Sequence, residues 1–143
     1  MTITIITIII AFLIYWIFIK DGQFKEGLGK FSKGDYSGSI QHFNNTIIKN
    51  PNHKKANYYL GMAFKHLADT SVNDKELYKR YAIENLIRAS NGIFNERANN
   101  IVEHIIVSET NSDLQRQLVS IAKKQLQTVN PELNREYFWL DKI

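Results

Sequence analysis

The strongest hydrophobic pattern in the chain lies at the amino terminus. Between Ile3 and Ile19 there is no charged residue. As a helix rising about 1.5 Å per residue, this run covers roughly 25 Å, close to the ~30 Å hydrocarbon core of a bilayer. The run is too long for an ordinary strand, and in lipid a single helix satisfies its own backbone polar groups. The pattern predicts a transmembrane anchor over residues 1–20, with residues 3–19 in the membrane.

A cleaved signal or a buried helix would fit this apolar run less well. A cleaved secretory signal needs a positive start and small residues at the cleavage point, and neither is present around residues 19–22. A buried helix that is apolar all round is rare in a small helical domain. Lysines follow the run at positions 20, 25, 30 and 33, so the positive-inside rule predicts a cytoplasmic domain. A domain on the periplasmic side of a bacterial inner membrane stays open as the alternative.

The apolar positions that follow have helical spacing and predict two pairs of helices. The first helix ends before Gly34. The second spans about Tyr36 to Lys49 and ends at Pro51, because proline has no N–H to donate. Its apolar positions, three and four residues apart, are Ile40, Phe43 and Ile47. The second pair covers about 53–67 and 75–91, with a polar loop at 69–74 between its helices.

The last third of the chain predicts one more pair of helices and a tail. The first of these helices carries an amphipathic stripe at Ala98, Ile101, Val102, Ile105 and Ile106. The sequence Ser112-Asp-Leu-Gln115 is a capping-box pattern and predicts the start of the next helix, which Pro131 ends. The aromatic tail beyond Glu132 either folds back to cap the helices or docks another chain.

Particular residues in the first four helices give the chain a family resemblance. Gly34-Asp35-Tyr36 forms a turn, Ser39 and Phe43 follow four residues apart, and Leu60-Gly61 comes nine residues after Pro51. This resembles the tetratricopeptide repeat (TPR), a helix-turn-helix unit of about 34 residues. A second copy of the same spacing of small and large residues occurs at Ala82, Leu86 and Ala89.

The resemblance implies an all-α fold, a short TPR-like solenoid of about three helix pairs after the membrane anchor. Residues 21–96 are expected to form two TPR-like repeats, the second with an insertion near residues 69–77. Residues 97–143 are expected to form a degenerate third pair and the tail. Terminal repeats are commonly atypical, and about three units are needed for stability.

The composition and motifs of the chain exclude several kinds of functional site. The chain has no cysteine, so disulfides and thiolate sites are excluded. Its formal net charge is +4, and dispersed lysines of this kind do not predict nucleic-acid binding. The four histidines lie far apart, and no nucleophile elbow, phosphate loop or dinucleotide fingerprint is present. The sequence predicts neither an enzyme nor a metal or cofactor site.

In TPR proteins the first helix of each repeat lines the inner surface, which binds protein segments. The resemblance places eight residues of this chain there: Phe24, Leu28, Phe31, Lys55, Tyr58, Met62, Lys65 and His66. The lysine and asparagine with which chaperone adaptors hold a carboxylate are replaced by Phe24 and Leu28. The remaining mixture of aromatic and basic residues suits an apolar or acidic segment.

The resulting hypothesis is a membrane-anchored TPR adaptor or scaffold that binds proteins during assembly of a membrane complex. A permanent structural subunit of a larger envelope or motility machine is the alternative. Some of the eight side chains could instead pack against the third helix pair.

Overall fold

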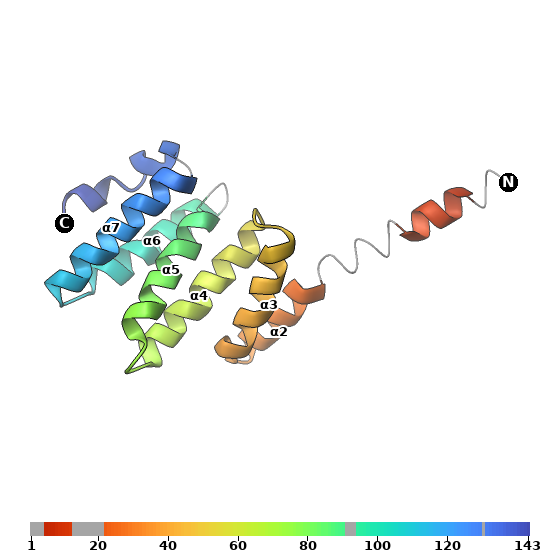
Figure 1. Cartoon of the computed structure of the whole chain (residues 1–143), viewed down its shortest axis with the longest axis horizontal. Coiled ribbons are helices and arrows are strands. Elements are labelled where there is room, and N and C mark those ends of the chain that lie inside the picture. The colour runs from red at the N-terminus through yellow and green to blue at the C-terminus, as the bar shows by residue number, and fades with distance from the viewer. Residues whose placement is uncertain (1–4, 13–21, 91–93, 130) are drawn as a thin grey trace.

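The computed structural model describes residues 5–12, 22–90, 94–129 and 131–143, and every element that these residues form is helical (Figure 1). The all-α part of the predicted fold class is therefore confirmed for them. Six α-helices and two short 3₁₀ helices make up the array that begins at residue 22. They are α2 (Gly22–Ser32), α3 (Tyr36–Lys49), α4 (Lys54–Thr70), α5 (Lys75–Ala89), α6 (Asn95–Val107), α7 (Ser112–Val129), η2 (Pro131–Arg135) and η3 (Phe138–Asp141).

The predicted transmembrane helix and the single-pass membrane localisation are wrong. Among the described residues, no helix combines the length and the apolar character that crossing a bilayer requires. The described part of the amino-terminal run is a helix over residues 5–12. Residues 1–4 and 13–20 of the predicted anchor lie outside the described residues.

The turn between α2 and α3 forms as its residues predict. Gly34 has a φ of 78°, a left-handed conformation that glycine adopts without steric cost. Asp35 then caps α3, and its carboxylate accepts a hydrogen bond from the Gly38 N–H at 2.8 Å. The Lys30 ammonium lies 3.0 Å from the same side chain. Two helices therefore meet at a tight, specifically stabilised corner.

The two helix pairs cross at equivalent glycines. A Cβ added to Gly27 on α2 would lie 2.7 Å from the ring of Phe43 on α3. A Cβ added to Gly61 on α4 would lie 2.7 Å from Leu86 Cγ on α5. Phe43 and Leu86 are the two large residues that share the small-large-small spacing. In both pairs, therefore, a glycine on the first helix lets the second helix approach closely.

The insertion in the second pair is taken up mostly by helix. α4 continues to Thr70, beyond its predicted end near Leu67, and α5 begins at Lys75 as predicted. Lys65 and Asp69, one turn apart, form an ion pair of 2.7 Å in the extra turn of α4. The loop that remains covers only residues 71–74 and is shorter than predicted.

Two hydrophobic clusters hold the array together. The smaller one lies between α2, α3 and α4 and contains Phe24, Phe43, Ala56 and Leu60. The larger one is built by α5, α6, α7 and the tail, with Ile83, Leu86, Val102, Ile106, Leu118 and Leu126 among its buried members. Phe64 on α4 packs against both clusters, so α4 connects the two halves.

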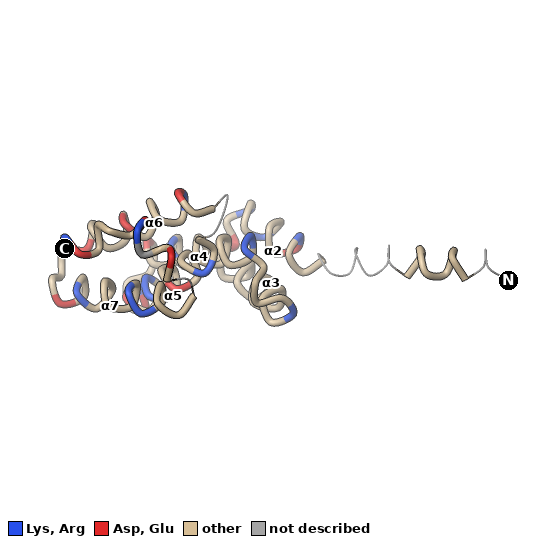
Figure 2. Tube along the Cα trace, turned by 90° about the horizontal axis from the view of Figure 1, so that it is seen from above, with Lys and Arg blue, Asp and Glu red and all other residues tan. Residues whose placement is uncertain are grey.

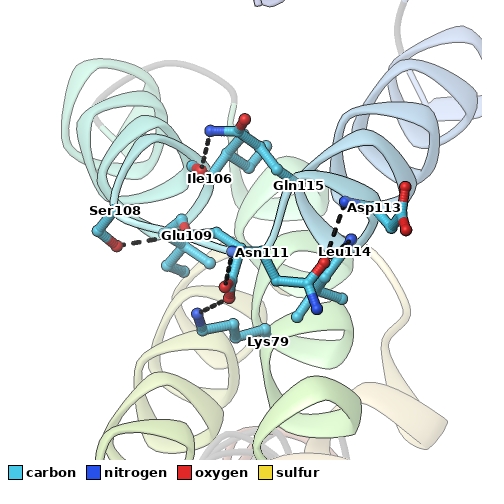
Figure 3. A network of polar contacts seen from close by, with 9 residues as sticks. Lys79, Ile106, Ser108, Glu109, Asn111, Asp113, Leu114 and Gln115 are labelled. Atoms are coloured by element: carbon cyan, nitrogen blue, oxygen red, sulfur yellow. Dashed lines mark hydrogen bonds and ion pairs between the residues drawn. The ribbon is translucent and has the colours of Figure 1, made fainter.

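The turn between α6 and α7 is a polar network (Figure 3). Asn111 Oδ1 accepts hydrogen bonds from the Asp113 and Leu114 N–H groups at 3.0 and 3.1 Å, so Asn111 caps α7 one residue before the predicted Ser112. The Gln115 side chain donates instead to the Ile106 carbonyl of α6 at 3.0 Å. The predicted capping box is therefore wrong in detail, because Gln115 joins the two helices.

The aromatic tail folds back onto the array, as the capping role among its two predicted roles requires. Tyr137, Trp139 and Leu140 are buried against the larger cluster. The Tyr137 hydroxyl lies 2.6 Å from Ser90 Oγ at the end of α5, and the Trp139 indole donates to Asn99 Oδ1 on α6 at 2.8 Å. The tail therefore covers the end of the array opposite α2 (Figure 1).

Candidate functional site

The first helices of the successive pairs line a common cleft. It has a volume of about 570 Å³. Two residues come from α2, two from α4 and three from the start of α6. They are Phe24, Leu28, Lys55, Tyr59, Phe94, Glu96 and Arg97. We refer to this feature as the α2–α4–α6 cleft.

An aromatic group that belongs to the core forms one wall of the cleft. The Phe24 side chain is only 8% exposed. Its ring centroid lies 5.9 Å from that of Phe43, 6.1 Å from that of Tyr59 and 4.9 Å from that of His53. Aromatic pairs at such distances are favourable and geometrically specific. This wall is therefore fixed by the fold before any ligand arrives.

Two successive tyrosines on α4 contact different halves of the molecule. Tyr59 faces the first helix pair, where its ring lies 5.4 Å from that of Phe31 and 5.9 Å from that of Phe43. Tyr58 stacks on Phe94 before α6, with ring centroids 4.8 Å apart, and burial raises the pKa of the Tyr58 hydroxyl. Together they link both sides of the cleft through α4.

The charged residues of the cleft are exposed and mostly basic. Lys55 and Arg97 contribute two positive charges, and Glu96 contributes one negative charge. The neighbouring Lys54 has a different task, because its ammonium donates to the Arg88 carbonyl at the end of α5 at 3.1 Å. Along the whole array, charges of both signs are dispersed (Figure 2). The local excess of positive charge over an aromatic wall distinguishes the cleft.

The structure brings three of the eight predicted binding residues into this cleft, namely Phe24, Leu28 and Lys55. Tyr58 packs half-buried against the larger cluster, in line with the alternative that some of the eight side chains pack against the third helix pair. Met62 is also half-buried on α4 and is not among the residues lining the cleft. Lys65 is paired with Asp69.

Phe31 and His66 belong to a separate aromatic group near the α2–α3 turn. His66 stacks on Tyr36 with ring centroids 4.3 Å apart and planes inclined by 4°, and Phe31 meets the same imidazole edge-on at 5.9 Å. Burial lowers the pKa of His66. These contacts are intramolecular packing, and neither Phe31 nor His66 is among the residues that line the cleft, although Phe31 packs against Tyr59.

Four cleft residues were not predicted from the sequence: Tyr59, Phe94, Glu96 and Arg97. Tyr59 was not predicted because the position in the repeat that lines the inner surface corresponds to Tyr58, one residue earlier. The residues near α6 were missed because the third pair shows no repeat motif, so no register could be carried over to it. The clue that the sequence did offer is Phe94 followed closely by two charges, just before the amphipathic stripe of α6.

The arrangement is suited to binding. Its lining offers an aromatic and aliphatic surface, two cationic donors and one carboxylate. In the described ranges, no group of three or more His, Asp or Glu residues is placed to hold a metal ion. A cleft of this composition recognises a ligand by apolar contact and by charge.

Comparison with known proteins finds no relative of the chain. No family model matches it, and neither does any curated protein or solved structure. The similarity to the tetratricopeptide repeat therefore rests on the residues of the chain itself.

Proposed function

We propose that the chain is an adaptor or scaffold of the TPR-like helical-repeat type, which holds a segment of a partner protein in the α2–α4–α6 cleft. The observation that carries the proposal is the cleft itself, lined by the first helix of each successive pair. Its volume of about 570 Å³ lies within the range typical of ligand sites, roughly 300–1,000 Å³.

The repeated geometry of the two helix pairs supports the family similarity. Gly27 against Phe43 and Gly61 against Leu86 are equivalent close contacts in successive units. Stacked units of this kind create extended concave surfaces, which repeat proteins use for binding. The proposal therefore places the binding surface on α2, α4 and α6 and not on α3, α5 and α7.

The chemistry of the cleft indicates the kind of segment it holds. Phe24, Tyr59 and Phe94 offer ring surface to an apolar side chain, and such anchors commonly supply most of the binding energy. Lys55 and Arg97 favour a carboxylate close to that anchor. We therefore expect a segment in which an aromatic or aliphatic residue lies next to aspartate or glutamate.

A peptide-selection experiment tests this function. The full chain is offered a random peptide library, and peptides that combine an apolar anchor with neighbouring acidic residues are expected to be enriched. Lys55→Glu with Arg97→Glu should weaken binding of the selected peptides by roughly tenfold or more, as loss of charged hydrogen bonds does. The matched control is Arg80→Glu with Lys124→Glu, an equal charge change at two exposed positions outside the cleft.

Two results would contradict the proposal. One is selection of peptides without acidic residues, and the other is unchanged binding by the Lys55 and Arg97 double variant. Native size analysis addresses the alternative of a permanent subunit. Co-purification with one stoichiometric partner that does not exchange would favour that alternative, whereas free protein that binds peptide reversibly favours the adaptor.

A further inference from the structure

A second pocket lies apart from the cleft, and most of the residues that line it are polar. It has a volume of about 180 Å³ and is formed where α4 ends, α5 begins and α6 ends. Its polar lining consists of Lys65, Asp69, Lys75, Lys79, His104 and Ser108. None of these residues lines the α2–α4–α6 cleft. We refer to it as the lysine pocket.

Lys79 is the central group of this pocket. Its side chain is only 9% exposed, and its ammonium lies 2.5 Å from Glu109 Oε2 in the α6–α7 turn (Figure 3). An ammonium carries three N–H donors, and a buried donor without a partner is costly. In the part of the chain that the structure describes, Glu109 provides the acceptor for one of them. Because Lys79 lines the pocket, its other two donors can serve an occupant there.

Other donors converge on the same space from three helices. Lys75 is the first residue of α5, and Asp74 makes no side-chain capping bond, so the positive end of this helix keeps donor capacity. Ser108 Oγ donates to the Ile105 carbonyl at 3.5 Å, a length at which the bond is weak. Among the described residues, Lys65 is paired with Asp69, a carboxylate that is 54% exposed. Such exposed pairs contribute little and yield easily to a ligand.

Negative charge in the surroundings limits what the pocket can hold. Asp69 and Glu109 oppose the three lysines, so these five groups leave a net charge of about one positive unit. The carboxyl ends of α4 and α6 add negative partial charge. The pocket therefore suits a single small anion and not a polyanion. A tetrahedral oxyanion offers more acceptor oxygens than a planar carboxylate and presents them in three dimensions, which suits donors that come from several helices.

We propose that the lysine pocket binds a phosphate group, either inorganic phosphate or the phosphate of a small monoester, through Lys65, Lys75, Lys79 and Ser108. Lys79 stays paired with Glu109 and uses its remaining donors. Lys65 turns from Asp69 to the ligand. An occupant would tie α4, α5 and α6 together and so stabilise the folded state by an amount that rises with the logarithm of its concentration above Kd.

The test is titration of the full chain with inorganic phosphate at constant ionic strength. Calorimetry measures the binding, and thermal melting measures the change in Tm. We expect saturable binding and a rise in Tm that chloride at the same ionic strength does not produce. Phenyl phosphate distinguishes the two sources. Binding as tight as that of inorganic phosphate indicates that a monoester is accepted, and failure to bind restricts the site to the free anion.

The decisive variant is Lys65→Gln with Lys75→Gln, since neither lysine is buried and the buried Lys79–Glu109 pair stays intact. Phosphate affinity should fall roughly tenfold or more. The matched control, Lys49→Gln with Lys124→Gln, removes two exposed lysines elsewhere and should bind as the natural chain does. Absence of saturable binding, an equal effect of chloride, or unchanged affinity in the decisive variant would each overturn the proposal. Peptide binding in the cleft is measured separately, so the two proposals fail independently.

Discussion

Gly61 on α4 lies so close to Leu86 on α5 that an added Cβ would stand 2.7 Å from Leu86 Cγ and 3.1 Å from the Ala82 carbonyl oxygen. Real Cβ atoms do not approach neighbours within the first of these distances, and the second neighbour is backbone, which moves less easily than a side chain. The crossing of α4 and α5 thus depends on the absence of a side chain at position 61. The same holds for Gly27 and Phe43 in the preceding pair.

The first prediction is that Gly61→Ala destabilises the fold by roughly 1–3 kcal/mol, the usual cost of overpacking, and that Gly61→Leu costs more. The measurement is urea unfolding followed by circular dichroism. The control is Gly29→Ala on α2, where an added Cβ would meet nothing within 4 Å. It is expected to be neutral or to stabilise by about 0.4–1 kcal/mol, because alanine restricts the unfolded chain. Equal effects of the two alanines would show that the crossing tolerates a side chain.

The second prediction concerns alkaline pH. Burial raises the pKa of Tyr137 from its ordinary value of 10.0 to about 12, because the phenolate would lose its hydration in the core. The folded state therefore keeps the proton longer than the unfolded state. This contribution to stability is complete below pH 10 and is lost as the pH rises toward 12, a total of roughly 3 kcal/mol.

Tyr137→Phe should flatten the alkaline loss of stability, measured by urea unfolding at a series of pH values. At neutral pH it should cost only about 1 kcal/mol, for the lost bond to Ser90. Ser90 Oγ keeps its other partner, the Leu86 carbonyl at 3.0 Å. Tyr81→Phe on the exposed face of α5 is the control, and its alkaline loss should match that of the natural chain. An unchanged alkaline loss in Tyr137→Phe would contradict the assignment.

The third prediction concerns acid pH and the buried ion pair of Lys79 and Glu109. The hydrogen bond from Lys79 lowers the pKa of Glu109 below its ordinary 4.5, helped by the Asn111 N–H. The stabilisation is therefore present above pH 4.5 and is lost as the pH falls through the lower folded pKa. Glu109→Gln should remove this acid-dependent part and cost roughly 3–5 kcal/mol at neutral pH, because it leaves a buried ammonium without its counter-charge.

An exposed ion pair in the neighbouring turn provides the control for Glu109. Asp113 and Arg116 lie 2.6 Å apart, but their side chains are 79% and 74% exposed. Asp113→Asn should cost no more than about 1 kcal/mol. If thermal melting gave similar losses for Asp113→Asn and Glu109→Gln, burial would not be the source of the strength of the Lys79 pair.

The fourth prediction compares two adjacent aromatic residues of the tail. Trp139 is 8% exposed and bonded to Asn99, whereas Phe138 is 58% exposed and lies beneath the Lys142 ammonium. Trp139→Ala should destabilise by roughly 3–5 kcal/mol and Phe138→Ala by less than about 1 kcal/mol, as buried and exposed rings do. Chemical denaturation measures both. The reverse order would mean that the tail does not cap the array in solution.

Local features of the array could be predicted from the sequence. Gly34 and Asp35 specify a turn through their own backbone and side-chain chemistry, and Pro51 stops the helix that precedes it because it has no N–H to donate. The spacing around Phe43 and Leu86 predicted that the two residues occupy equivalent positions in successive helix pairs. These inferences succeeded because their physical causes lie within a few residues or within one repeated unit.

Features that depend on distant parts of the chain could not be predicted in this way. Lys79 and Glu109 are thirty positions apart, and nothing near either residue marks it as paired. Arg97 enters the cleft only because of how α6 is placed, for which the sequence offered no register. Tyr58 was assigned to the binding surface by family position, yet its ring packs on Phe94. For the apolar amino-terminal run, the prediction used hydropathy alone, which describes composition and does not specify what the run packs against.

The capping tail follows in sequence all the helices that it covers, and this order has a consequence for folding during synthesis. The cluster around Phe43 is complete in sequence once Leu60 has been made, so the first helix pair and α4 can pack early. The larger cluster needs Tyr137 and Trp139, which the ribosome adds after every residue that they cover. We therefore expect α5, α6 and α7 to remain incompletely packed until the tail has left the ribosome. A nascent chain shortened by a few residues would expose the apolar surface that chaperones bind.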